Sequence, residues 1–328
     1  MDIEILKQLS ENKKAAWQHL MQSAELHTDL TAEETVLLWE GHTLAATGSR
    51  DGSVLKHLAV SPDFQGADLT AKVLTILRQN AFSEGYRHLF LYTKPKNEAI
   101  FRSLFFYPVA KTGDVVLMED KKDGIASFIN SFPKKSDGGT VGSCVMNCDP
   151  FTRGHRYLVE QAAALCDYLY IFVLSEDKSF FPAKERLEMV RLGTEDLKNV
   201  TVLPTGPYLI SSATFPTYFL KDRDKAASVQ CALDIAIFLK HFVPYFSITR
   251  RFVGTEPLSP MTNTYNETLK SLLPPSGVEV FEIPRLEIAS APVSASRVRS
   301  LWKEGDRAQL FELVPKSTYD FLTRRYPL

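Results

Sequence analysis

The segment Thr140-Val-Gly-Ser-Cys-Val-Met-Asn-Cys-Asp-Pro-Phe-Thr-Arg-Gly-His-Arg-Tyr-Leu-Val-Glu160 decides the fold of the second half of the chain. Its apolar start predicts a buried strand, and Pro150 limits where that strand can end. A helix is expected to open at Gly154 and His155, because apolar residues then recur at helical spacing. The segment therefore predicts a strand, a short turn and a helix.

The start of this helix is a candidate phosphate-binding site. A helix N-terminus offers unpaired N–H groups and a partial positive charge. Gly154 would let the backbone approach a phosphate without a Cβ in the way. His155, in the first turn, could donate a hydrogen bond to a phosphoryl oxygen as negative charge builds there. The alternative is a surface histidine at an ordinary helix start, which is common for an isolated Gly-His pair.

Length and composition set the class of protein. The chain has 328 residues, of which 45% are hydrophobic and 23% are charged, as expected of two globular domains. A net charge of -1 gives no argument for a nucleic-acid or membrane partner. We expect no apolar run of membrane-spanning length and no signal peptide, and hence a cytoplasmic protein.

The cysteines point to the same compartment. Cys144, Cys148, Cys166 and Cys231 show no Cys-x-x-Cys spacing. We expect reduced, mostly buried thiols and neither a disulfide nor a metal site.

A polar stretch with Pro and Gly, Ser131 to Gly139, predicts a linker at 133–139 between domains at 1–132 and 140–328. The first half predicts an α+β domain, with helices at 1–24, 67–83 and 97–104 and strands at 34–40, 43–49, 54–60, 88–93 and 115–119. The second half alternates, with strands at 141–146, 168–174, 200–203, 247–254 and 278–283 and helices at 154–166, 183–192, 226–242, 263–273 and 294–304, followed by more helix. This alternation predicts a Rossmann-like α/β fold, with a parallel sheet covered on both faces and ligands at the carboxyl ends of its strands.

A second candidate phosphate motif is Val293-Ser-Ala-Ser-Arg-Val-Arg299, which opens a predicted helix. The hydroxyls of Ser294 and Ser296 and the N–H groups beside them could bind phosphate oxygens. Arg299 lies three residues after Ser296, on the same helix face, so we expect it to face the phosphates. Arg297 cannot share that face closely. The alternative is a serine-capped helix with solvated arginines.

Three further segments carry weaker signals. Lys184, Arg186 and Arg191 could place positive charge at the sheet's carboxyl edge, or belong to an ordinary charged helix, which is the interpretation we take for Arg191. The backbone of Gly254-Thr-Glu256 could contact an adenosine, or form a plain turn. The hydroxyls and aromatics of the segment Leu209 to Leu220 could line an acceptor pocket, although aromatic side chains are more often part of a core.

These segments together carry a family resemblance. Thr152–His155 with Val293–Arg299 resembles the two phosphate motifs of the pantetheine-phosphate and nicotinate-nucleotide adenylyltransferases, and Lys184–Arg191 resembles their Glu-Arg-Leu-x-Met helix. Those families usually have histidine where this chain has Thr152, which leaves His155 as the main imidazole. Longer stretches, from Met146 to Ala163, Ile210 to Lys221 and Val253 to Pro260, resemble the citrate lyase ligases, and that resemblance covers essentially the whole chain.

The resemblance implies an acid–thiol ligase that uses ATP, Mg²⁺ and acetate. Through acetyl-adenylate it would acetylate the prosthetic-group thiol on the acyl-carrier (gamma) subunit of citrate lyase, releasing AMP and pyrophosphate. The prosthetic group would be phosphoribosyl-dephospho-CoA. The catalytic residues implied are Thr152, His155 and Arg299, with no protein metal ligand. The implied ATP-binding residues are Asn147, Pro150, Phe151, Thr152, Gly154, His155, Gly254, Glu256, Ser294, Ser296 and Arg299.

Two alternatives stay open. One is an adenylyltransferase that moves AMP onto a phosphate ester, which would share the ATP site and differ in its acceptor. The other is a non-catalytic module that senses an acyl carrier or coenzyme A.

The first half resembles the GNAT-superfamily N-acetyltransferases. Val60-Ser-Pro-Asp-Phe-Gln-Gly-Ala-Asp-Leu-Thr70 is similar to their motif A, in which backbone N–H groups bind the pyrophosphate of coenzyme A. Gln65 and Gly66 fit that motif, but Asp68 stands where a glycine is usual. A carboxylate there would repel the pyrophosphate and crowd the backbone. We therefore expect the fold without acetyl-CoA catalysis, and a role in docking the carrier through Lys94 and Lys96.

Overall fold

The computed structural model describes residues 1–28, 32–65, 68–134, 138–175, 179–209, 220, 225–256, 260–289 and 291–327. The chain divides into two compact units. The first comprises Met1–Gly124 with Phe215–Val229, and the second comprises Ile125–Thr214 with Gln230–Leu328. The predicted linker at 133–139 lies partly outside the described residues, so the domain boundary placed there stays a prediction.

The described part of the first unit is a mixed sheet with helices. Its seven strands follow the order β1-β2-β3-β4-β5-β7-β6, and every neighbouring pair is antiparallel except β4 and β5. The strands are β1 (Asp2–Leu6), β2 (Glu34–Glu40), β3 (Thr43–Asp51), β4 (Val54–Val60), β5 (Phe90–Thr93), β6 (Tyr107–Lys111) and β7 (Val116–Glu119). The helices are α1 (Glu11–Ser23), α2 (Leu69–Ser83) and α3 (Glu98–Ser103). This is the α+β architecture that the sequence predicts.

Two predictions for the first unit need correction. The region 1–24 is not all helix, because Asp2–Leu6 forms β1 and pairs with β2 from Asp2↔Trp39 to Leu6↔Thr35. The strand β6 is missing from the prediction. It lies at the sheet edge, and its register shifts between Pro108 and Ala110. A proline within a short run weakens any strand prediction, and edge strands are where prolines are tolerated.

The second unit contains the predicted parallel sheet. Its order is β10-β9-β8-β11-β12, with every neighbouring pair parallel. The strands are β8 (Val141–Met146), β9 (Tyr168–Val173), β10 (Val200–Pro204), β11 (Arg250–Gly254) and β12 (Glu279–Ile283), and β13 (Glu287–Ile288) with β14 (Ala291–Pro292) forms a separate short ribbon. The strand order reverses between β8 and β11. In open parallel sheets such a switch point is where ligands bind.

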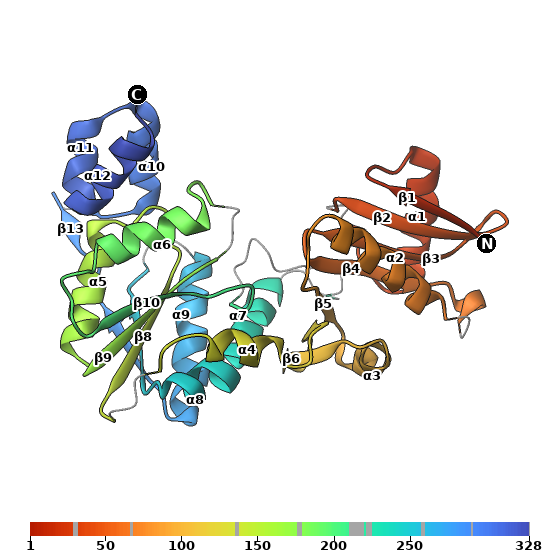
Figure 1. Cartoon of the computed structure of the whole chain (residues 1–328), viewed down its shortest axis with the longest axis horizontal. Helices are drawn as coiled ribbons and strands as arrows, with labels where there is room; N and C mark the ends of the chain where they lie inside the picture. The colour runs from red at the N-terminus through yellow and green to blue at the C-terminus, as the bar shows by residue number, and fades with distance from the viewer. Residues whose placement is uncertain are drawn as a thin grey trace. The chain divides into compact units, whose positions relative to one another are not determined.

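Helices cover both faces of this sheet (Figure 1). On one face, Cys144, Ile171 and their neighbours share a core with residues of α5 (Arg153–Ala164) and α6 (Ala183–Leu192). On the other face, Tyr170 and Phe172 pack against Phe246. That second layer contains α7 (Ala226–Ile237), the π-helical turn η4 (Phe238–Phe242), α8 (Val243–Phe246) and α9 (Pro260–Leu272). The remaining helices are α4 (Gly124–Asn130), α10 (Ala295–Glu304), α11 (Arg307–Leu313) and α12 (Lys316–Arg325).

The stretch Ala226–Phe246 corrects one expectation. By length and composition it is the single helical stretch in the described chain that could cross a membrane. Half of its apolar window is buried inside the protein, as in the core helix of a globular domain. The predicted burial of the cysteines is confirmed, because all four are buried.

Candidate active site

A cavity of about 700 Å³ opens at the carboxyl ends of β8, β11 and β12. The first turns of α5 and α10 also border it. Eight of the residues implied to bind ATP line this cavity: Asn147, Thr152, Gly154, His155, Gly254, Glu256, Ser294 and Ser296. The structure thus brings two sequence motifs about 140 residues apart to one site, as the phosphate hypothesis requires.

The cavity forms because β8 and β11 diverge. Their registered pairing consists of Arg250↔Gly142 and Arg251↔Ser143. By contrast, β8 stays paired with β9 along its whole length, from Val141↔Tyr168 to Met146↔Val173. Arg251 is therefore the last residue of β11 that pairs with β8, and the two strands separate beyond it.

Thr152 and His155 cap the start of α5 reciprocally. The Thr152 hydroxyl oxygen accepts the backbone N–H of His155 at 3.3 Å, and His155 Nδ1 accepts the backbone N–H of Thr152 at 3.0 Å. The neutral imidazole has one donor and one acceptor nitrogen, so with Nδ1 accepting, the ring hydrogen sits on Nε2. Desolvation, helped by the charge of Arg285, lowers the pKa of His155 to about 4. His155 is thus a neutral Nε2–H donor at pH 7.

Gly154 holds the two motifs close together. A Cβ on Gly154 would lie 3.3 Å from the carbonyl oxygen of Val293 and 3.4 Å from its Cβ. Contacts this short leave little room for any side chain. The start of α5 therefore packs against the residue that precedes Ser294, the N-cap of α10.

The α10 motif has its serines at the cavity and its arginine beside it. The Ser294 hydroxyl accepts the backbone N–H of Arg297 at 3.2 Å. Arg299 donates from Nη2 to the Ser296 hydroxyl at 3.2 Å, which confirms that these two residues share a face. Arg299 Nη1 donates to the Asp149 carbonyl oxygen at 2.5 Å and lies 3.5 Å from the Asp149 carboxylate. In the described structure Arg299 thus braces the turn before α5 and does not line the cavity.

The turn between β8 and α5 is held from several sides. Asn147 lines the cavity, and its Oδ1 accepts a hydrogen bond from Arg186 Nη1 at 2.6 Å. Pro150 and Phe151 are buried rather than exposed to the cavity, and the Phe151 ring stacks on His155 with centroids 6.0 Å apart. Arg186, a candidate source of positive charge at the edge, is fully buried and supports this turn instead.

Several cavity residues were missed from the sequence. Arg285 donates from Nε to the Thr255 carbonyl at 2.9 Å and forms an ion pair with Glu256. Asn266 Nδ2 donates to the Gly254 carbonyl at 3.0 Å, which fixes the turn after β11. Arg251 and Tyr265 also line the cavity. Two consecutive arginines in the strand Arg250–Gly254 were the local signal that could have identified Arg251.

The predicted acceptor segment from Leu209 to Leu220 lies mostly outside the described residues, because 210–219 are not described. Its role stays a prediction.

The first unit has a cavity of its own, of about 720 Å³. Strands β4 and β5 pair in register at Val54↔Phe90 and Leu55↔Leu91, and the cavity is lined by residues beyond those pairs. Asp68, Lys94 and Lys96 are among the lining residues. Asp68 precedes α2 with a φ of 51° and makes no side-chain cap there. Asp68, which stands where the acetyltransferase motif usually has glycine, therefore lies at the wall of this cavity.

Comparison with known proteins identifies the family. The model of the citrate lyase ligase C-terminal domain matches residues 141–322. The chain is 38% identical over 326 residues to the [citrate [pro-3S]-lyase] ligase of Klebsiella pneumoniae, covering 98% of this chain and 95% of that protein. It is also 38% identical over 323 residues to the [citrate [pro-3S]-lyase] ligase of Escherichia coli (strain K12), covering 95% and 91%.

Solved structures show more distant likenesses to parts of this chain. Escherichia coli ElaA covers 37% of this chain and 99% of its own, with a TM-score of 0.33 and 16% identity. Thermotoga maritima TmcAL bound with alpha-thio ATP covers 57% of this chain and 56% of its own, with a TM-score of 0.36 and 16% identity. The family match spans more than half of the chain and the curated relatives cover nearly all of it, so this chain belongs to the citrate [pro-3S]-lyase ligase family of enzymes.

Proposed function

We propose that this chain activates citrate lyase by acetylating the prosthetic-group thiol of its acyl-carrier subunit, with ATP and acetate as substrates. The observation that carries the proposal is the cavity at the switch point. The N-termini of α5 and α10 and a neutral imidazole donor meet there. Backbone N–H groups and helix dipoles at such positions favour phosphate oxygens.

The first step forms acetyl-adenylate. A carboxylate oxygen of acetate attacks the α-phosphorus of ATP, the bond to the β-phosphate oxygen breaks, and pyrophosphate leaves. Acetate is already ionised at neutral pH, so this step needs no general base. His155, through Nε2–H, would donate to a phosphoryl oxygen on which charge builds, while Ser294 and Ser296 bind the other phosphate oxygens.

The second step transfers the acetyl group. The thiolate of the carrier's prosthetic group attacks the acetyl carbonyl carbon, and AMP leaves with the electron pair of the broken anhydride bond. The carrier supplies the nucleophile, which agrees with the buried cysteines of this chain. Burial raises the pKa of Cys144 to about 12, so that thiol is a poor nucleophile.

Mg²⁺ fits this site as an ion carried by the nucleotide. The described residues contain no group of three or more His, Cys, Asp or Glu side chains that could hold a metal. Bound Mg²⁺ would neutralise part of the triphosphate charge, mainly through phosphate oxygens and water. We propose that the enzyme acts in the cytoplasm, where its four buried cysteines would stay reduced.

The test is acetate-dependent exchange of labelled pyrophosphate into ATP, followed by acetyl transfer to the thiol-form carrier subunit. We expect exchange with acetate in the absence of the carrier, and acetylated carrier when both are present. Pyrophosphate release that depends on phosphopantetheine and not on acetate would instead identify an adenylyltransferase. Failure to bind ATP would favour the non-catalytic alternative.

A further inference from the structure

Three arginine side chains are almost completely buried among the described residues: Arg50, Arg186 and Arg251. Burying a guanidinium is costly unless its charge and its N–H groups find partners. The partners of each one therefore indicate what it does.

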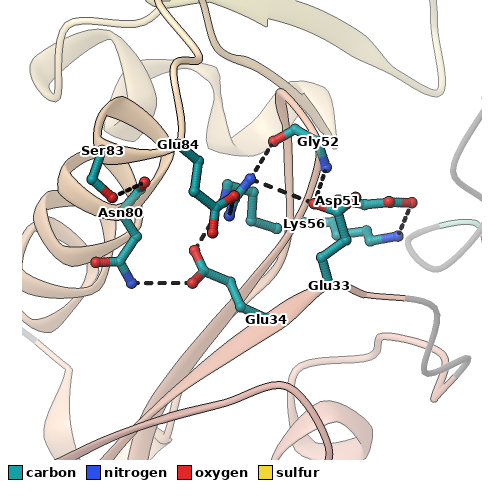
Figure 2. A network of polar contacts seen from close by, with 9 residues as sticks. Glu33, Glu34, Asp51, Gly52, Lys56, Asn80, Ser83 and Glu84 are labelled. Atoms are coloured by element: carbon teal, nitrogen blue, oxygen red, sulfur yellow. Dashed lines mark hydrogen bonds and ion pairs between the residues drawn. The ribbon is translucent and has the colours of Figure 1, made fainter.

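Arg50, in the first unit, is surrounded by carboxylates. Its Nε lies 2.8 Å from Glu34, its Nη2 lies 2.5 Å from Glu84, and its Nη1 lies 3.5 Å from Glu33. Nη1 also donates to the Gly52 carbonyl at 2.9 Å. Figure 2 shows Glu33, Glu34, Gly52 and Glu84 gathered in this network. The charge of Arg50 is balanced within the protein.

Arg186, in the second unit, is satisfied by oxygen acceptors. Its Nε donates to the Phe181 carbonyl at 3.0 Å, and its Nη1 donates to the carbonyl of Asn147 at 2.7 Å. This arginine holds the turn before α5 and leaves no need for a ligand.

Arg251 differs from both. Its Nε and Nη1 have no hydrogen-bond partner, and it forms no ion pair with any carboxylate of the described residues. Its one ring contact is with Phe238, whose centroid lies 4.9 Å from Cζ. A buried cation paired only with an aromatic ring is expensive to maintain, and a bound anion would offset that cost.

The position of Arg251 restricts which anion this is. It lines the cavity and is the last residue of β11 that pairs with β8. Gly254, at the carboxyl end of β11, is three residues further along the strand, or roughly 10 Å at about 3.3 Å per residue. A triphosphate held by the helix N-termini would lie beyond the carboxyl ends of the strands. The position of Arg251, further back along β11, therefore suits a separate, small anion.

The neighbours of Arg251 suit a short aliphatic chain. Val253 lies two residues further along β11, on the same sheet face, and it lines the cavity together with Val145. Tyr265 also lines the cavity, and its hydroxyl donates to the Asp234 carboxylate at 2.6 Å. One cation beside small apolar side chains matches a carboxylate with a methyl group.

We propose that Arg251 binds the carboxylate of the acid substrate, acetate, and presents one of its oxygens to the α-phosphorus. The proposal rests on the function proposed above and assigns the acid-binding residue of the same site. The guanidinium would offset the repulsion between the carboxylate and the triphosphate, and its planar fork would orient the attacking oxygen. No covalent step passes through Arg251, so it is a substrate-binding residue.

The experiment compares R251Q and R251K with the unmodified chain. The measured quantities are the KM for acetate in ATP–pyrophosphate exchange and the Kd for ATP from calorimetry. For R251Q we expect the acetate KM to rise by about 10- to 100-fold, as for the loss of a hydrogen bond to a charged group. The ATP Kd of R251Q should stay within about threefold of that of the unmodified chain. The acetate KM of R251K should lie between those of the unmodified chain and R251Q, because lysine keeps the positive charge but lacks the planar guanidinium.

The matched control is R250Q. Arg250 is the preceding residue, its side chain points to the opposite face, and it forms an ion pair with Glu279 and a hydrogen bond to the Leu165 carbonyl. We expect R250Q to leave both the acetate KM and the ATP Kd unchanged.

Thermal unfolding separates binding from a structural role. R251M replaces an unpaired buried cation by an apolar side chain, so its Tm should equal or exceed that of the unmodified chain. A merely structural arginine would instead lower the Tm in every variant without a selective effect on acetate.

Two results would overturn the inference while the proposed function stands. One is an unchanged acetate KM in folded R251Q. The other is a weaker ATP Kd with an unchanged acetate KM, which would assign the guanidinium to a phosphate. A third result concerns the proposed function itself: if the unmodified chain binds ATP but no carboxylate supports exchange, that function fails and the inference fails with it.

Discussion

His155 Nδ1 accepts the backbone N–H of Thr152 at 3.0 Å, and this bond determines which nitrogen of the histidine can act on a ligand. With Nδ1 occupied as an acceptor, the neutral ring carries its hydrogen on Nε2. The same bond satisfies one of the free N–H groups at the start of α5. The hydrogen bond that caps α5 therefore also determines which nitrogen of His155 is the candidate catalytic donor.

We expect His155→Ala to slow acetate-dependent pyrophosphate exchange by about 100-fold or more, because one donor to the developing charge is lost. Thr152→Ser is the matched control, since it keeps the hydroxyl that caps α5 and should retain activity within a few-fold. Near-normal exchange by a folded His155→Ala protein would contradict the role of the imidazole.

The pKa of His155 makes stability depend on pH in a defined direction. It is about 4 in the folded chain against an ordinary value of 6.5, so between these values the unfolded chain binds a proton that the folded chain does not. Stability should therefore fall as the pH drops from about 6.5 toward 4. Between pH 7.5 and 5 we expect this residue to contribute a loss on the order of 1–2 kcal/mol.

Urea denaturation measures this contribution. The free energy of unfolding is determined at both pH values for the unmodified chain and for His155→Ala, and the two changes with pH are compared. Other titrating groups are common to both proteins and cancel. Equal pH dependence in the two proteins would show that the histidine pKa is not depressed.

Gly154→Ala tests whether the two motifs must pack closely. The added methyl would meet the Val293 carbonyl oxygen at 3.3 Å and push the start of α10 away from α5. We expect ATP affinity to fall by about 10-fold. Thermal stability should stay similar, because the higher helix propensity of alanine offsets the strain that its methyl group introduces. Gly113→Ala, where an added Cβ meets nothing within 4 Å, is the control. Unchanged ATP affinity would mean that the two helix starts can separate freely.

Arg299→Ala should weaken ATP binding by about 1.5–3 kcal/mol, the range for hydrogen bonds to charged groups. Two effects contribute: loss of a cation beside Ser296, and loss of the bond to the Asp149 carbonyl. Arg297→Ala is the control, since that side chain reaches Gln309 instead. Calorimetry that gives the same ATP affinity for Arg299→Ala as for the unmodified chain would remove Arg299 from the site.

The first unit should not act as an acetyltransferase. Asp68 lines its cavity with a φ of 51°, so it brings both a negative charge and a strained backbone to the place where a pyrophosphate would bind. Acetyl-CoA titrated into the full chain should show little binding, and Asp68→Gly should restore weak binding. Asp68→Asn removes the charge and keeps the Cβ, which separates repulsion from crowding. Micromolar binding by the unmodified chain, or acetyl transfer to an amine, would refute the prediction.

The sequence by itself determined the elements whose signals are local. β8 and α6 have the predicted bounds, because an apolar run and a helical periodicity are complete within each segment. The phosphate motifs were also predictable, since a helix start after a strand and a serine cap are properties of a few consecutive residues. Their meeting at one cavity followed from the alternation of strands and helices, which fixes the edge where parallel strands end.

Only the tertiary structure decided the features that depend on partners distant in sequence. β1 is a strand because β2 supplies its hydrogen bonds. Arg299 bonds to a carbonyl 150 residues away, so helical periodicity could give its face but not its partner. Arg251 is buried, has no ion-pair partner among the described residues and lines the cavity at the point where the pairing of β8 with β11 ends. Burial and charge balance are sums over contacts from the whole fold, and no single stretch of sequence contains them.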